Sequence, residues 1–384
     1  MKSAHSDNGV CASLMKTESH RRTSFPLSVL AIGLFLFSSQ QARPPQGKTD
    51  LVVSEKLADW MSATQDSSLD GTIAFLSDDR VVLSVCRTHG DLHCPLLVIL
   101  QVTDAGFRPL SRSDHSRPFG SVHAMETGGV LVLPNFWLGL PTELLSADLT
   151  PKLLIPGHLK ISLSGGTTGS TGPNNTWSIF RVCPSLDCVE KARSGIGELE
   201  AVSDDQIAIL DHNTVWIETI QGKQRGNFKV QSKCATELEF VDKERIYSRS
   251  CGHDRIVDRN GKELVRLRDS EKLGTGFRRW SEGGTRLLYD QTVRTVPALQ
   301  NLGETTLAVA TLGMGAIDEV PNGELVRVLD THTGRTCFDW KDTKRLANMG
   351  VYPHAALSPS GKFLALITEG ELRVYRMPDV CSEK

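Results

Sequence analysis

The sequence lacks two features that would each point to a large class of proteins. No run of apolar residues reaches the roughly 20 that a helix needs to cross a bilayer. No charge of one sign dominates, because 43 basic and 45 acidic residues leave a net charge of −2. This balance argues against a nucleic-acid partner and against a polybasic protein held at a membrane surface. The 384 residues, 39% of them hydrophobic, suit one large all-β domain or two smaller globular domains.

Signatures of catalysis and cofactor binding are also missing. No nucleophile elbow, phosphate loop, zinc-protease helix or dinucleotide fingerprint occurs. Ser164–Asn175 (SGGTTGSTGPNN) is rich in Gly but has no Lys for a phosphate, and we interpret it as a flexible hairpin loop. Cys86–Cys94 (CRTHGDLHC) places two His four residues apart, a spacing that suits a helix, whereas this segment lies between two expected strands. We therefore expect no metal, no cofactor and no catalytic residue that the sequence identifies.

The first 42 residues follow the order of a secretory signal peptide. A polar stretch ending in Arg21 and Arg22 precedes the 13-residue apolar run Phe25–Phe37, and small polar residues follow. Thirteen helical residues cover about 20 Å, which is too short for a hydrocarbon core of about 30 Å. We expect export to the periplasm or the extracellular space, removal of residues 1–42 after Ala42, and no stable membrane span. The alternatives are an uncleaved signal anchor, since no clean Ala-x-Ala site is present, and a start at Met15.

The remaining residues, 43–384, form one expected all-β domain. Short runs rich in Val, Ile, Leu, Phe and Thr alternate with turns of Asp, Asn and Gly, and only Glu55–Met61 suggests a helix. The first strand of each group is expected around one of seven residues: Ile73, Val122, Ile161, Leu199, Leu238, Phe277 and Ala355. Successive positions differ by 49, 39, 38, 39, 39 and 78 residues, and about 39 is the length of one four-stranded propeller blade.

The double gap at the end of this series decides the number of blades. We favour an insertion at about residues 292–322, because this stretch has a poor strand pattern and several Pro and Gly residues. Arg286–Asp290 before it and Leu325–Leu329 after it then form the second and third strands of one blade. The sequence thus predicts a β-propeller of seven four-stranded blades, with eight blades as the alternative.

The end of the chain resembles a known group of repeat proteins. Ala355–Met377 (AALSPSGKFLALITEGELRVYRM) is similar to the last blade of WD-like and TolB-like β-propellers, in which a strand leads through S-P-D-G-K to a second strand. Here Ser360 replaces the Asp. Trp280–Asp290 is a degenerate copy, and Val326–Trp340 resembles the strand–D-x-x-T-G–strand half of a blade. The resemblance implies a repeat protein of the bacterial secreted type, and it specifies architecture rather than chemistry.

Two functions from different classes fit this architecture. The first is an exported, monomeric propeller that binds a protein or glycan ligand as an extracytoplasmic interaction scaffold. The second is a hydrolase or lyase whose residues come from several blades at the mouth of the central channel. The missing catalytic signature favours the first function. Three or more carboxylates or histidines converging at one channel mouth would favour the enzyme, and a flat apolar patch on a rim would favour the scaffold.

A ring of blades also needs a closing seam. Asp50–Glu55 (DLVVSE) is the only clear strand before Ile73. An unpaired edge would remain at the last blade unless strands from both ends of the chain meet there. We therefore expect Asp50–Glu55 to be the outer strand of the last blade, beside Glu371–Arg376.

The nine cysteines predict a set of disulfides in an exported protein. Removal of Cys11 with the signal peptide leaves an even number. Three pairs enclose expected hairpin turns, which would place their side chains at disulfide distance: Cys86 with Cys94, Cys183 with Cys188, and Cys234 with Cys251. Cys337 and Cys381 pair by elimination. Buried free thiols that pack as small apolar groups are the alternative.

Removal of the signal peptide is directly testable. Because the apolar run is too short to anchor the chain, the exported protein is expected to begin near Arg43. Intact-mass measurement of that protein checks this, and a mass that retains Phe25–Phe37 would show an anchor instead.

Overall fold

The structure is a computed structural model. It describes residues 50–59, 69–87, 93–114, 117–118, 120–134, 140–155, 159–231, 236–250, 253–269, 273–295, 320–342, 354–368 and 370–381. All of them belong to one compact unit, residues 40–384. The expected signal peptide and residues 296–319 of the expected insertion lie outside the described residues, so both stay predictions. Within the described ranges, no helix is long and apolar enough to cross a membrane.

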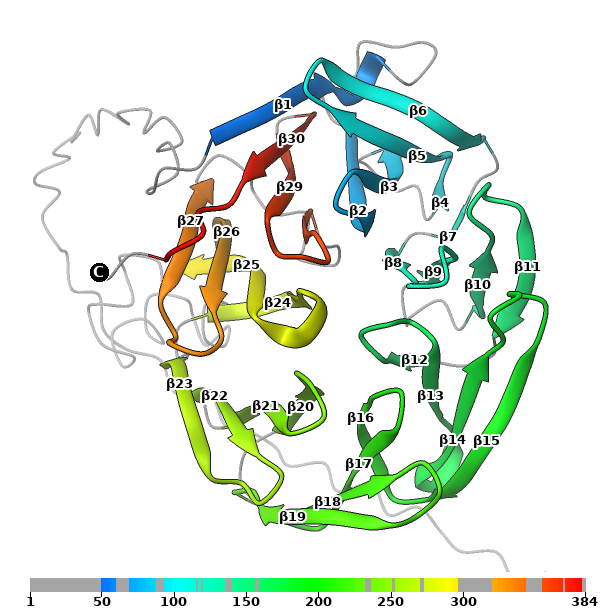
Figure 1. The fold of residues 1–384 in the computed structure, drawn as a ribbon, viewed down its shortest axis with the longest axis vertical. Helices are drawn as coiled ribbons and strands as arrows, with labels where there is room; N and C mark the ends of the chain where they lie inside the picture. The colour runs from blue at the N-terminus through cyan, green and yellow to red at the C-terminus, as the bar shows by residue number, and fades with distance from the viewer. Residues whose placement is uncertain are drawn as a thin grey trace, which may run out of the picture. The chain divides into compact units, whose positions relative to one another are not determined.

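Seven four-stranded antiparallel sheets surround a central axis, as Figure 1 shows. From the innermost strand outward, the first three blades are β2 (Leu69–Ser77), β3 (Arg80–Arg87), β5 (Leu96–Thr103) and β6 (Gly106–Ser113); β8 (Gly120–Ala124), β9 (Val130–Pro134), β10 (Thr142–Leu145) and β11 (Pro151–Ile155); and β12 (Leu159–Ile161), β13 (Thr167–Thr171), β14 (Thr176–Val182) and β15 (Val189–Ile196). β4 (His93–Cys94) and β7 (Arg117–Pro118) form a separate two-stranded sheet.

The other four blades follow the same order. They are β16 (Glu198–Val202), β17 (Gln206–Asp211), β18 (Thr214–Thr219) and β19 (Gln224–Lys229); β20 (Thr236–Phe240), β21 (Arg245–Ser250), β22 (His253–Asp258) and β23 (Glu263–Asp269); β24 (Leu273–Trp280), β25 (Arg286–Thr295), β26 (Val320–Asp330) and β27 (Thr336–Asp342); and β28 (Ala355–Leu357), β29 (Phe363–Thr368), β30 (Glu371–Arg376) and β1 (Asp50–Lys56).

The sheet order confirms the predicted fold class and the count of seven blades. Each of the seven expected first strands coincides with the innermost strand of a blade. β25 pairs with β26, so the predicted insertion falls between the second and third strands of blade 6. Its predicted bounds, residues 292–322, are too wide, because residues 292–295 and 320–322 belong to these two strands. The prediction of a helix at Glu55–Met61 is wrong over the described residues. They form the end of β1 and the single 3-10 turn Leu57–Asp59.

Each of the seven interfaces between neighbouring blades holds one hydrophobic cluster. Successive side chains of a strand point to opposite faces, so one strand supplies two clusters. In β3, for example, Val81 and Leu83 pack toward blade 7, whereas Val82 packs toward blade 2. Because both faces of the sheets are covered, a strand inside a blade can be continuously apolar instead of alternating, as in β5, where Leu96–Leu100 are all buried.

The interpretation of Ser164–Asn175 as a hairpin loop is wrong. Residues 167–171 form β13, the second strand of blade 3. A Cβ on Gly169 would lie 2.5 Å from Leu199 Cδ2 and 2.7 Å from Val202 Cγ2, both in the next blade. Gly169 therefore allows the two sheets to approach closely.

The ring closes as the sequence predicts, because β1 pairs with β30 as the outer strand of blade 7. The ladder runs from Asp50 opposite Arg376 to Lys56 opposite Glu371. Val53 is buried in the cluster shared by blades 7 and 1. Phe107 N of blade 1 donates to the Glu55 carboxylate at 2.8 Å, so the strand is tied to both sides of the seam.

A second set of contacts joins neighbouring blades through the first residue of the second strand. In blades 4, 5 and 6 this residue donates to a carbonyl in the first turn of the next blade: Gln206 Nε2 to Lys243 O at 3.2 Å, Arg245 Nη2 to Gly283 O at 3.3 Å, and Arg286 Nη1 to Gly361 O at 2.9 Å. A long donor at one repeated position thus links blades 4 to 7 in series.

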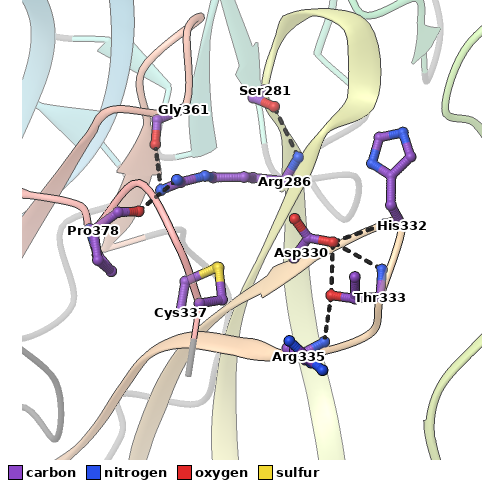
Figure 2. The surroundings of a disulfide bond; sticks show 10 residues. Ser281, Arg286, Asp330, His332, Thr333, Arg335, Cys337, Gly361 and Pro378 are labelled. Atoms are coloured by element: carbon purple, nitrogen blue, oxygen red, sulfur yellow. Dashed lines mark hydrogen bonds between the residues drawn. A yellow bond between two sulfur atoms is a disulfide. The ribbon is translucent and has the colours of Figure 1, made fainter. Parts of the chain in front are cut away.

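Arg286 also reaches the end of the chain, as Figure 2 shows. Its Nη2 donates to Pro378 O at 2.6 Å. Nearby, Cys337 of β27 forms a disulfide with Cys381, and their Cα atoms are 4.3 Å apart. The segment after β30 is therefore attached to blade 6 by a covalent bond and a charged hydrogen bond.

Two of the four predicted cysteine pairs lie among the described side chains. Besides Cys337 and Cys381, Cys183 and Cys188 are disulfide-bonded across the turn between β14 and β15, with Cα atoms 5.3 Å apart. The other two pairs stay predictions because they include side chains outside the described part: Cys86 with Cys94, and Cys234 with Cys251.

The seam predicts a strong dependence of stability on β1. Val53→Asp places a carboxylate in the cluster between blades 7 and 1, and we expect it to destabilise the fold by about 3 kcal/mol or more. Deletion of residues 50–56 should lower the melting temperature further, because it exposes the edge of β30. Thermal unfolding of the purified variants measures both effects.

Leu51→Asp is the matched control, since Leu51 is on the same strand but 54% exposed. It should stay within about 0.5 kcal/mol of the unmodified protein. Equal melting temperatures for Val53→Asp and Leu51→Asp would contradict the pairing of β1 with β30.

Candidate functional site

The innermost strands of five blades line a cavity of about 480 Å³ along the axis of the ring. A second cavity of about 290 Å³ lies mainly among the turns between first and second strands. We call the end of the channel at these turns the first-turn mouth. Both cavities are lined by His123, Leu163, Arg279 and Trp280, so these residues form the constriction between them.

The larger cavity carries more charge than the inner strands of a propeller need for packing. Five of its charged side chains come from three consecutive positions around the ring: Glu200 from β16, Glu237 and Glu239 from β20, and Arg278 and Arg279 from β24. Lys160 of β12 adds a sixth. Because these strands are short and extended, each blade can present only one or two such groups to the axis.

Arg278 is fully compensated within the protein. Its Nη2 lies 2.5 Å from a Glu237 carboxylate oxygen and 3.1 Å from one of Glu239. Its guanidinium also lies over the ring of Tyr247, 4.9 Å from the centroid. Although burial opposes its charge, these carboxylates raise the pKa of Arg278 above its ordinary value. Trp280 Nε1 donates to the other oxygen of Glu239 at 2.7 Å, which completes the network.

Arg279 has a different environment, although it is the next residue. Among the described residues its guanidinium makes one hydrogen bond, from Nη1 to Arg278 O at 3.4 Å, and no ion pair. Burial lowers its pKa, with partial opposition from Glu239 and Asp290. An arginine nevertheless stays charged at any physiological pH. Arg279 therefore places an incompletely paired positive charge in the constriction.

His123 faces the same constriction from β8. Its Nε2 is buried and has no hydrogen-bond partner among the described residues. Burial, with a smaller contribution from Arg279, lowers the pKa of His123 to about 3. The imidazole is therefore neutral near pH 7 and can offer one donor or one acceptor.

Lys160 and Glu200 lie on neighbouring blades of the larger cavity. Lys160 Nζ is 3.7 Å from Glu200 Oε2, and the Glu200 residue is only 6% exposed. Burial raises the pKa of Glu200 to about 7; Lys160 opposes this shift, and Glu198 adds to it. This carboxyl group therefore changes its charge near neutral pH.

Acidic groups collect at the first-turn mouth. Glu126, Asp204 and Glu282 all line the smaller cavity. Burial raises the pKa of Glu126, and repulsion from Asp204 and Glu282 adds to this shift. Asp204 accepts a hydrogen bond from Ser164 at 2.5 Å.

These acidic groups are too far apart to share a metal ion. Among the described residues, the cluster with metal-ligand spacing is Cys183, Cys188 and Glu190, whose two cysteines are joined in a disulfide. That cluster therefore has no thiolate to offer. The expectation that the two histidines of Cys86–Cys94 bind no metal stays a prediction, because residues 88–92 lie outside the described ranges.

None of the channel residues is singled out by the sequence analysis. His123 shows no pattern with other histidines, and charged residues within strands resemble solvated positions. One signal does exist: Glu237, Glu239, Arg278 and Arg279 stand in strands expected to be innermost, where both faces are covered and a charge needs a reason.

Comparison with solved structures finds a similarity to the C-terminal WD40 domain of Sif2. The TM-score is 0.48 and the sequence identity 10%, over 86% of this chain and 99% of that domain. No protein-family model matches the sequence, and a search of curated proteins finds no match. The propeller assignment rests on the sheet order of this chain, which agrees with the WD-like resemblance of its last blades.

Glu200 makes the stability of the folded protein depend on pH. Its folded pKa of about 7 lies above the ordinary 4.5, so the protonated form favours folding. This stabilisation is fully present below about pH 4.5 and is lost as the pH rises through about 7. Glu200→Gln should remove this loss of stability. Between pH 5 and pH 8 its free energy of unfolding should rise about 1–3 kcal/mol above that of the unmodified protein.

Urea unfolding at several pH values measures this difference. Glu218→Gln removes a carboxylate of β18 that pairs with Arg193 away from the channel, and it controls for the loss of one charge. Parallel stability curves for Glu200→Gln and the unmodified protein would show that Glu200 does not titrate near neutral pH.

Proposed function

We propose that the protein is an exported binding propeller that holds a small polar ligand in its central channel. The observation that carries the proposal is the 480 Å³ cavity with charged groups from adjoining blades, among them the incompletely paired Arg279. The volume lies within the range of about 300–1,000 Å³ that is usual for ligand sites. Buried polar groups without partners cost folding energy, so their presence needs a reason other than stability.

Export is supported by the predicted signal peptide and by the cysteines. Two described disulfides tie down a hairpin and the end of the chain. Such bonds persist in oxidising compartments and are rare in reducing ones. A propeller with these features suits a binding role in the periplasm or outside the cell.

The exposed apolar side chains favour the channel over a protein-binding rim. Leu51, Leu154, Ile196 and Leu264 are each at least 46% exposed, but they belong to the outer strands of four different blades. Scattered apolar residues of this kind are ordinary surface. A flat apolar patch, which would favour a scaffold for a protein partner, is not formed by these residues.

One observation favours the alternative, a hydrolase or lyase. Glu200, with its pKa near neutrality, faces a cationic Lys160 in the larger cavity, and general acids and bases often show such shifts. If the channel is catalytic, Glu200→Gln should abolish turnover of a bound ligand and leave its affinity nearly intact. Unchanged ligand after prolonged incubation with the unmodified protein supports the binding role.

Blocking the channel tests the binding proposal. Ser121 lines the larger cavity, so Ser121→Trp would fill it with an indole. A thermal-shift panel of neutral, acidic and basic small molecules identifies ligands of the exported full chain, and calorimetry gives their affinities. We expect Ser121→Trp to weaken binding at least tenfold, about 1.4 kcal/mol or more.

Ser111→Trp, on the outer strand β6, is the matched control and should leave every affinity unchanged. If all ligands bind Ser121→Trp as tightly as the unmodified protein, the channel is not the binding site. A panel without any ligand would equally count against the proposed function.

A further inference from the structure

On the premise that the channel binds a small ligand, we propose that its constriction is a carboxylate site, in which Arg279 and His123 hold the acid group of a hydroxylated ligand. The two side chains come from blades 6 and 2 and line both cavities. A ligand that occupies the larger cavity therefore meets them at its narrow end.

Arg279 supplies the positive charge of the site. The two carboxylates that favour its charge, Glu239 and Asp290, make their hydrogen bonds to other groups. Glu239 binds Arg278, and Asp290 accepts backbone N–H groups at the start of blade 7, at 2.6 and 3.0 Å. A guanidinium with free donors in a partly desolvated cavity gains most from a planar, bidentate acceptor, and a carboxylate has this geometry.

His123 sets the charge that the site can accept. Because its imidazole is neutral near pH 7, Arg279 is the single unpaired cation among the described residues of the constriction. One positive charge matches a monoanionic carboxylate. A doubly charged phosphate would bring one uncompensated negative charge toward Glu239 and the acids of the first-turn mouth. The buried His123 Nε2, which has no described partner, can donate a hydrogen bond to the second carboxylate oxygen.

The rest of the lining indicates what the acid group is attached to. Leu163 and Trp280 supply apolar surface at the constriction. The hydroxyl of Ser121 and the Lys160–Glu200 pair offer further donors and acceptors in the larger cavity. Hydroxyl groups on a compact carbon frame can bond to such groups. The ligand class is therefore a small hydroxylated carboxylic acid.

Two probes of the same shape isolate the carboxylate. D-Glucuronate and D-glucose differ only in the oxidation state of one terminal carbon, so calorimetry with the exported full chain compares the acid group directly. We expect glucuronate to bind at least tenfold more tightly than glucose. Arg279→Gln should weaken glucuronate binding at least tenfold and leave glucose unchanged, and Arg279→Lys should fall between. Arg193→Gln, on the outer strand β15, is the control and should change neither affinity.

Several outcomes would overturn the carboxylate site. They are equal affinity for glucuronate and glucose, unchanged glucuronate binding in Arg279→Gln, inorganic phosphate binding as tightly as glucuronate, and no binding of glucuronate or of N-acetylalanine. N-Acetylalanine binding more tightly than glucuronate would overturn the hydroxylated ligand class, even if Arg279→Gln weakens that binding. If Arg279→Gln does not fold, His123→Phe replaces it and should weaken glucuronate binding about fivefold.

Neutral probes distinguish a carboxylate site from a channel that binds ligands without an acid group. If glucose and other neutral probes bind the unmodified protein and lose affinity in Ser121→Trp, the channel is a binding site without a carboxylate requirement. If no probe of any charge is affected by Ser121→Trp, the channel itself is not the site.

Discussion

The pairing of β1 with β30 is the interaction on which the rest of the structure depends. A ring of blades closes only when its first and last sheets are held together, and in this chain the outer strand of blade 7 comes from the other end of the sequence. The seam combines a backbone ladder, the buried Val53, and the bond from Phe107 N to the Glu55 carboxylate. Long donors in blades 4 to 6 and the disulfide between Cys337 and Cys381 then limit movement between neighbouring blades. Because each blade packs against two others, closure of the ring stabilises every interface between blades.

A closed ring also explains how charge can persist along the axis. The nearly buried guanidinium of Arg278 stabilises the fold only if its charge is satisfied, and the partly exposed carboxylates of Glu237 and Glu239 satisfy it. The fixed positions of the inner strands meet this requirement for Arg278, whereas the described residues leave part of the hydrogen-bonding capacity of Arg279 and His123 unused. Ion pairing within the protein thus accounts for Arg278, whereas it does not account for Arg279 among the described residues.

The sequence predicts the architecture well because a propeller repeats one short unit of four antiparallel strands. The seven expected first strands all coincide with innermost strands, and the terminal strand takes its predicted place at the seam. Errors arise where composition misleads: the Gly-rich Ser164–Asn175 contains β13, since close packing against the next blade requires small residues there. The channel site could not be predicted, because it joins single residues from several blades whose positions around the axis depend on the closed ring. A charge in a covered strand, such as Arg279, is the one local sign of it.

Amide hydrogen exchange of the native protein, followed by mass spectrometry, tests the closure of the ring most directly. Because opening of β1 breaks the seam, its amides should exchange as slowly as those of β29 and β30, through the same global opening. Peptides that cover residues 50–56 would then show protection equal to peptides that cover 363–376. Fast exchange in residues 50–56, with the other strands of blade 7 still protected, would contradict the central role of the seam, because the ring would then stay closed without its N-terminal strand.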